Sequence, residues 1–224
     1  PGASDVNTVT IQSATGNYSD VKIFHNAYTD PGYNTDKYGV VTFNGADYVT
    51  LRGVTVTSTD KTFPALVYMI NTSQHTTVDA CHLYTDRIES TTTAEQLVLV
   101  RQLAIDKENC NNDYFTLSNC LLEGGYIGVR MGGTSYVALP KEVGGVIENN
   151  ILRNQGSKSL YVSDELGTKI RNNRIENNAT TKEFDGIDAQ VRDLYDESFE
   201  ISGNKFHLNT NNSALAITLR QMTG

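Results

Sequence analysis

The sequence predicts an all-β protein, a right-handed parallel β-helix (a solenoid) of about seven coils that occupies residues 1–224 as a single domain. The first observation is a six-residue template with apolar residues at positions one and six and a small or amide residue at position three. The second is that the template occurs six times, at steps of 23 to 39 residues, and such periods are typical of solenoids. The third is a short alternating apolar run after each copy, which is a strand signature.

The template is clearest where residues 147–152 repeat as residues 170–175. An α-helix would place apolar residues three and four apart, and the template does not. We therefore expect a short strand that turns a corner at the third position. Stacked coils would then lie about 4.8 Å apart around one continuous apolar core. The six copies begin at Leu51, Val78, Leu117, Ile147, Ile170 and Ile201.

The chain before the first copy is expected to enter the solenoid through short strands at residues 9–11, 21–23 and 41–43. Longer inserts at residues 57–76, 84–116 and 132–140 are expected to be loops. In solenoids such loops commonly build a binding surface on one face, and solvated connections are the alternative. The alternating runs that follow the template copies lie at residues 67–69, 98–100, 127–129, 160–162, 187–189 and 215–217.

The sequence stops in the middle of a coil, after the run at residues 215–219. A solenoid end without a cap exposes its core and its strand edges. We therefore expect this chain to be a piece of a longer protein.

The fourth template position predicts two stacks of side chains. Asn150, Asn173 and Asn204 share it, and we expect their amides to hydrogen-bond from coil to coil in a structural role. Cys81 and Cys120 share it in successive copies, within disulfide range. Neighbours in register point the same way, so we favour two buried thiols over a bridge. The three cysteines, Cys110 included, fit no zinc spacing.

Composition and motifs exclude several classes of protein. A net charge of −8 argues against a nucleic-acid partner, because phosphate binding needs clustered Lys and Arg. No apolar run reaches the length of a membrane span. The four His are scattered, and no catalytic triad order, HExxH motif or phosphate-binding loop is present.

Four residues are candidate ligand-binding residues. Alternation along the last strand of each coil directs Arg101, Arg130, Tyr161 and Asp188 outward, and stacking would align them in one ladder. Arg offers a bidentate fork and Tyr a stacking face, which suit sugar carboxylates and sugar rings. An ordinary solvated face is the alternative. The same alternation directs Tyr68 and Leu99 outward.

Segments near the start of the chain resemble a known group of proteins. Residues 10–16, 20–23 and 44–51 look like the opening of β-helix modules in large secreted proteins of Bacteroidota. The resemblance implies a pectin-lyase-like topology and export, so a secreted or cell-surface location. It does not imply catalysis.

Asp185-Gly186-Ile187-Asp188 is similar to part of the acidic motif of polygalacturonases, in which paired carboxylates supply an acid and a base at an inverting spacing. The resemblance reaches only Asp185 and Asp188 as catalytic candidates, because the family's second Asp pair, Gly-His-Gly and Arg-Ile-Lys are missing. Pectate lyases, also β-helices, use an Arg or Lys base and usually Ca²⁺. Asp164, Asp193 and Asp196 are turn acids that could bind Ca²⁺ if coils bring them together.

The repeat is well formed and no complete catalytic set accompanies it. The leading hypothesis is therefore a non-catalytic exported module, a surface scaffold or adhesin whose partner is a polysaccharide or cell-surface glycan. The alternative is a polysaccharide lyase or glycoside hydrolase acting on acidic polysaccharide, with Asp185, Asp188, Arg101 and Arg130 as its candidate residues.

Overall fold

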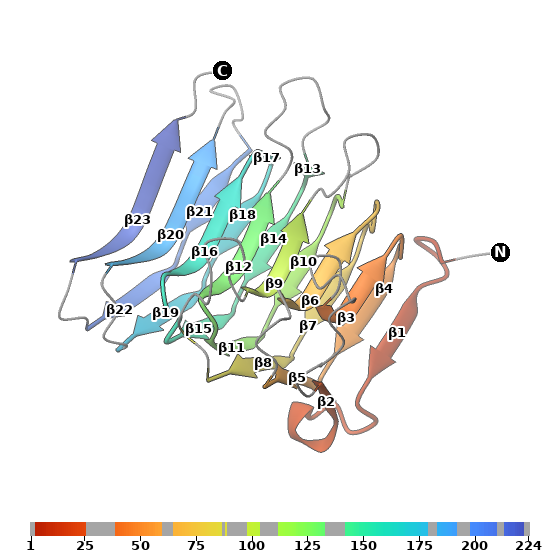
Figure 1. The fold of residues 1–224 in the computed structure, drawn as a ribbon. Coiled ribbons are helices and arrows are strands. Elements are labelled where there is room, and N and C mark those ends of the chain that lie inside the picture. The colour runs from red at the N-terminus through yellow and green to blue at the C-terminus, as the bar shows by residue number, and fades with distance from the viewer. Residues whose placement is uncertain are drawn as a thin grey trace, which may run out of the picture.

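The chain folds as a parallel β-solenoid, which confirms the predicted fold class. The structure is a computed structural model that describes residues 3–25, 39–59, 65–86, 88, 98–103, 112–132, 142–178, 183–191, 198–209 and 213–221. Its three large sheets, here called A, B and C, have seven parallel strands each. Successive strands of each sheet follow the order of the chain from one end to the other (Figure 1). Each coil thus adds one strand to A, then one to B, then one to C.

The strands of the three sheets are short, and only two in sheet C reach nine residues. Sheet A contains β1 (Val9–Gln12), β4 (Val49–Arg52), β7 (Thr77–Asp79), β10 (Thr116–Ser118), β14 (Val146–Glu148), β18 (Lys169–Arg171) and β21 (Glu200–Ser202). Sheet B contains β2 (Lys22–His25), β5 (Thr55–Ser58), β8 (His82–Thr85), β11 (Leu121–Gly124), β15 (Ile151–Arg153), β19 (Arg174–Asn177) and β22 (Lys205–Leu208). Sheet C contains β3 (Gly39–Asn44), β6 (Ala65–Ile70), β9 (Val98–Leu103), β12 (Ile127–Gly132), β16 (Lys158–Ser163), β20 (Glu183–Val191) and β23 (Ser213–Gln221). A small fourth sheet pairs β13 (Glu142–Val143) with β17 (Glu165–Leu166).

The template spans the corner between sheets A and B. Its first residue lies in a strand of sheet A and its sixth in the following strand of sheet B, as Leu51 and Val56 do. The template did not predict the coil that precedes Leu51. Ile11 pairs with Leu51, and Ile23 pairs with Val56, but the 3-10 helix η1 (Tyr18–Asp20) is inserted between them.

The third template position has a left-handed backbone, which explains its residue types. Its φ lies between 51° and 63° in all six copies. Gly adopts this conformation without a steric penalty, and Asn tolerates it better than other residues. Ala80 has neither property. The residues concerned are Gly53, Ala80, Asn119, Asn149, Asn172 and Gly203.

Replacing Ala80, whose φ is 51°, with Gly should therefore stabilise the protein. A left-handed conformation costs an L-residue about 1–2 kcal/mol, and the added freedom of Gly in the unfolded chain offsets part of the gain. We expect an increase of about 0.5–1 kcal/mol in the free energy of unfolding, measured by urea denaturation. Ala189→Gly, in the buried part of β20, is the control and should destabilise. A lower stability of Ala80→Gly would contradict the argument.

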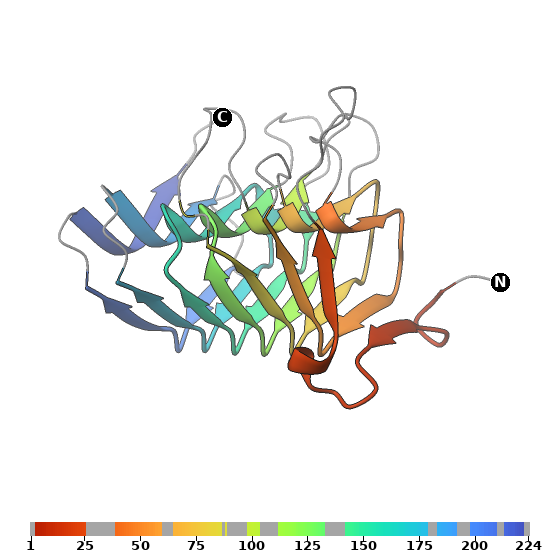
Figure 2. The same ribbon diagram turned by 60° about the horizontal axis from the view of Figure 1, so that its bottom comes forward.

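The three sheets surround the interior of the coils (Figure 2). Apolar side chains fill this interior in columns. In sheet A, for example, Val78, Leu117, Ile147 and Ile170 pair in register and are completely buried. The columns explain why the template needs an apolar residue at the same place in every coil.

The fourth template position forms a buried hydrogen-bonded stack, as predicted. The Oδ1 atom of Asn204 accepts from the backbone N of Asn173 at 2.9 Å, and Asn173 Oδ1 accepts from Asn150 N at 3.0 Å. Asn150 Oδ1 accepts from Cys120 N at 2.9 Å, and Cys120 Sγ accepts from Cys81 N at 3.4 Å. One stack therefore begins as cysteines and continues as asparagines.

Cys81 and Cys120 are both buried free thiols, which confirms the preference for thiols over a bridge. Burial raises the pKa of Cys120 well above its ordinary value. Cys110 lies outside the described residues.

Candidate functional site

The predicted ladder forms on the outer face of sheet C. In successive strands Arg101 pairs with Arg130, Arg130 with Tyr161, and Tyr161 with Asp188. Tyr68 extends the row at one end and Thr218 at the other. The strands that carry the row lie side by side (Figure 1). The structure thus brings the four candidate ligand-binding residues together, and their binding role stays a prediction.

One end of this face is packed rather than solvated. Tyr68 is fully buried, clusters with Ala65 and Ile70, and has the guanidinium of Arg101 at 5.1 Å from its ring centroid. The outward prediction for Leu99 is wrong, because this residue is buried in the main core. In the pairing of β6 with β9, Ala65 pairs with Val98 and Val67 pairs with Val100, while Leu99 has no partner residue. The strand therefore bends at Leu99, and its side chain turns inward.

The same bend explains the Asp-Gly-Ile-Asp segment. Lys158 pairs with Asp185 and Leu160 with Ile187, while Gly186 is skipped. A Cβ atom at Gly186 would lie 2.6 Å from the carbonyl oxygen of Ala216, so the bend requires Gly. Residues three apart in a regular strand face opposite sides. The bend instead places Asp185 and Asp188 on one face, which gives the segment a structural role.

Lys158 bridges the two candidate catalytic carboxylates. Its Nζ lies 2.6 Å from Asp185 Oδ2 and 2.6 Å from Asp188 Oδ2, and the Asp188 side chain is only 1% exposed. Arg220 approaches Asp188 Oδ2 at 3.4 Å, and Thr218 donates to Asp185 Oδ1 at 2.9 Å. Burial lowers the pKa of Lys158, but the hydrogen bonds to the two carboxylates outweigh burial and raise it above its ordinary value. Lys158 therefore stays an ammonium.

This geometry fits an ion cluster better than the acid–base pair of an inverting glycosidase. The two carboxylate oxygens lie no farther apart than twice 2.6 Å, with the ammonium between them. An inverting glycosidase leaves about 6.5–9.5 Å between its carboxyl groups for a water. The second oxygen of Asp188, Oδ1, is buried and has no hydrogen-bond partner among the residues that the structure describes. The catalytic role of Asp185 and Asp188 stays a prediction.

Two cationic side chains lie close to the ring of Tyr161, beside this cluster. The Arg130 guanidinium carbon lies 5.5 Å and Lys158 Nζ 5.9 Å from the centroid of its ring. Within the described residues Arg130 forms no ion pair, and its Nε is buried without a hydrogen-bond partner. The guanidinium of Arg130 is thus able to take an acidic partner.

The candidate calcium ligands are only partly placed. Asp164 is 6% exposed and has a left-handed backbone at the end of β16. Asp193 and Asp196 lie outside the described residues. Across the part of the chain that the structure describes, no three His, Cys, Asp or Glu side chains lie close enough to hold a metal ion.

Sequence reasoning missed a buried acidic corner, formed by Glu142 and Glu165 between sheets C and A. The two residues pair in register and are 1% and 3% exposed. The amide of Gln102 donates to Glu142, and Asn112 Nδ2 donates to Glu142 Oε1 at 3.1 Å. Burial raises the pKa of Glu165 to about 8. Burial, reinforced by the charge of Glu165, also raises the pKa of Glu142 well above its ordinary value.

A signal for this corner is present in the sequence. Glu142 and Glu165 each lie five residues before the first residue of a template copy, Ile147 and Ile170. The 23-residue repeat therefore includes the five residues that precede each of these two template copies.

None of the protein-family models, curated proteins or solved structures compared with the chain matches it. No helix among the described residues is long and apolar enough to cross a membrane.

Proposed function

We propose that this chain is a non-catalytic module of an exported β-helix protein, a surface scaffold or adhesin that binds acidic polysaccharide along the outer face of sheet C. One observation carries the proposal: the Arg130 guanidinium lies beside Tyr161 and forms no ion pair within the described residues. A planar guanidinium matches a carboxylate with two parallel hydrogen bonds, so a sugar acid is the fitting partner.

The contacts of Lys158 favour binding over catalysis. A hydrolase of the proposed type needs one protonated and one ionised carboxyl group. The ammonium of Lys158 instead holds both Asp185 and Asp188 in one ion cluster. A lyase needs a base that gives up its proton near neutral pH, and the raised pKa of Lys158 opposes that role.

Export and a surface location are supported by the resemblance of residues 10–16, 20–23 and 44–51 to secreted pectin-lyase-like modules. A solenoid also offers a long surface on which a polymer contacts several coils at once. The row from Arg101 to Thr218 crosses five neighbouring strands of sheet C, which suits an extended glycan.

Arg130→Gln should weaken binding of a polyuronate about tenfold, because a hydrogen bond to a charged group is worth about 1.5–3 kcal/mol. Isothermal titration calorimetry with polygalacturonate measures the change. Arg174→Gln removes the same charge from sheet B, where its side chain is 63% exposed, and should keep wild-type affinity.

Three results would overturn the proposal. The first is a wild-type protein that binds no polyuronate. The second is an Arg130→Gln variant that binds as tightly as its Arg174→Gln control, and the third is chain cleavage by the wild type that Asp188→Asn abolishes. Mass spectrometry of the products would then assign the lyase alternative if the new ends are unsaturated, and the hydrolase alternative if they are not.

A further inference from the structure

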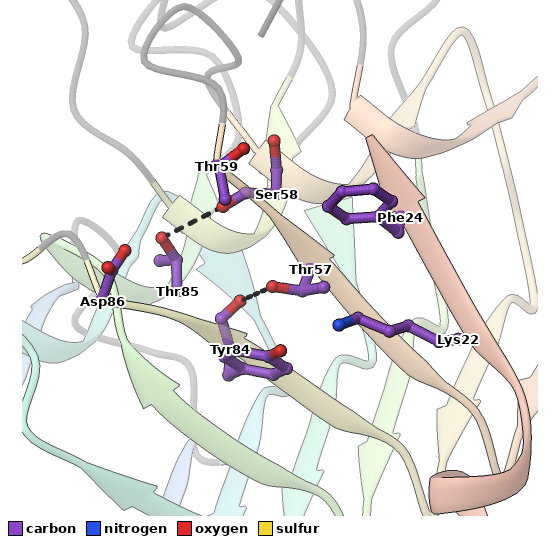
Figure 3. A pocket seen from close by; sticks show the side chains of 8 residues that line it. All are labelled: Lys22, Phe24, Thr57, Ser58, Thr59, Tyr84, Thr85 and Asp86. Carbon is purple, nitrogen blue, oxygen red and sulfur yellow. Dashed lines mark hydrogen bonds between the residues drawn. The ribbon is translucent and has the colours of Figure 1, made fainter. Parts of the chain in front are cut away.

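A pocket of about 160 Å³ lies on the outer face of sheet B, near the first coils, and shares no residue with the ladder on sheet C. Its lining comes from β2, β5 and β8 and from the residues that directly follow β5 and β8 (Figure 3). The lining residues are Lys22, Phe24, Thr57, Ser58, Thr59, Tyr84, Thr85 and Asp86.

The pocket has two aromatic walls and a small floor. Phe24, Thr57 and Tyr84 are consecutive members of one row across the sheet, so the short Thr57 side chain lies between two rings. The Nζ of Lys22 lies 5.4 Å from the centroid of Phe24 and 5.7 Å from that of Tyr84. Phe24 is 48% exposed, which leaves its ring accessible to a ligand. Figure 3 shows the Lys22 side chain reaching between the two rings.

Three hydroxyl groups of the lining already donate their protons to the backbone. Thr57 donates to Tyr84 O at 2.7 Å, Ser58 to His25 O at 3.0 Å and Thr85 to Ser58 O at 3.4 Å. The oxygen of Thr57 therefore offers lone pairs to a ligand but no proton. The carboxylate of Asp86 is a further acceptor.

Lys22 supplies the positive charge of the pocket. Among the described residues it forms no ion pair, and its contacts are with the two rings. One cation, several acceptors and two ring faces together match a ligand with one anionic group, several hydroxyl donors and an apolar ring face.

We propose that this pocket binds a single uronic-acid ring. Its carboxylate would pair with Lys22, its hydroxyl groups would donate to Asp86 and Thr57, and its C–H face would pack on an aromatic wall. The volume is below the range of roughly 300–1,000 Å³ that holds drug-sized ligands, so the pocket itself has room for one sugar ring. The inference is independent of the function proposed above, because it uses no residue of sheet C.

The test is an NMR titration of the ¹⁵N-labelled protein with methyl β-D-glucuronide and with its neutral counterpart, methyl β-D-glucoside. We expect the glucuronide to shift amide signals of β2, β5 and β8 and to bind up to about fivefold more tightly than the glucoside. A partly exposed ion pair is worth up to about 1 kcal/mol.

Lys22→Gln should reduce the affinity for the glucuronide about fivefold and remove the preference over the glucoside. Lys205→Gln is the matched control, because Lys205 is the last member of the row that Lys22 begins, is also exposed, and lies at the other end of sheet B. It should bind like the wild type. Unchanged thermal melts would show that both variants are folded.

Equal binding of the two glycosides, an unaffected Lys22→Gln variant, or shifts confined to sheet C would each overturn the inference. So would the absence of any shift with the glucuronide. Arg130→Gln separates this inference from the proposed function, since it should leave glucuronide binding in the pocket unchanged.

Discussion

Asn173→Ala should destabilise the solenoid by about 3–5 kcal/mol, although Asn is a polar residue in a turn. Asn173 is 1% exposed. Its Oδ1 accepts from the backbone N and from the Nδ2 of Asn150, both at 3.0 Å. Its Nδ2 donates to Ile147 O at 2.9 Å and to Asn204 Oδ1 at 3.0 Å. The Ala variant leaves buried polar groups of Asn150 and Ile147 unsatisfied, at about 1–3 kcal/mol each.

Urea denaturation followed by circular dichroism measures this loss. Asn209→Ala is the control, because Asn209 is exposed and its described hydrogen bond, to Asn177 O, comes from the backbone and survives. Asn173→Asp keeps the acceptor but loses both donors, so we expect it not to restore stability. A decrease of less than about 1 kcal/mol in the free energy of unfolding of Asn173→Ala would show that the stack of Asn side chains contributes little to stability.

The fold was predictable because its corner restricts the chain in the same way in each coil. A left-handed residue at position three and apolar residues at positions one and six leave a pattern that survives changes in loop length. The first coil was missed because η1 separates β1 from β2 and breaks the six-residue spacing. The template depends on a fixed spacing between its apolar residues, so an insertion between them hides the copy in the sequence. The strands β1 and β2 still pair in register with β4 and β5.

The ladder was predictable to the extent that strands alternate regularly. Alternation holds from Arg101 to Asp188, and the register places these residues in one row. Alternation fails at the bend in the strands of sheet C. There the side chain of Leu99 points into the core, and Lys158 lies on the outer face with Asp185. No periodic rule gives the position of such a bend, so the bridging role of Lys158 was not foreseen.

The protein should lose stability as the pH rises from 5 to 9, because of Glu142 and Glu165. Burial raises the pKa of Glu165 from 4.5 to about 8 and raises that of Glu142 as well. A carboxyl group with a raised pKa in the folded state binds its proton more tightly there than in the unfolded chain. Its stabilising contribution is complete below the unfolded pKa and is lost as the pH rises through the folded pKa.

Neighbouring carboxylates act in the same direction as burial. Asp113 and Asp164 add negative charge that favours the protonated form of Glu165, while the hydroxyl of Thr168 opposes them. Burial also raises the pKa of Asp113, against the Val143 hydrogen bond and the charge of His75. Carboxyl groups with ordinary pKa values are largely ionised above pH 5, so they contribute little to the slope between pH 5 and 9.

Glu165→Gln should flatten this slope. An amide resembles a protonated carboxyl group in shape and does not ionise, so the variant should match the wild type near pH 5. At pH 9 it should be more stable by roughly 3–5 kcal/mol, which is the cost of ionising the buried group. Free energies of unfolding from urea titrations at intervals across this range measure both curves.

Glu183→Gln is the matched control, because Glu183 is an exposed carboxylate at the start of β20. Its pH profile should follow the wild type. A wild-type stability that is flat or rising between pH 5 and 9 would contradict the argument. So would a Glu165→Gln variant that keeps the wild-type slope, because the proton taken up on folding would then be bound elsewhere. A flattened slope in Glu165→Gln alone would assign the pH dependence to the acidic corner between sheets C and A.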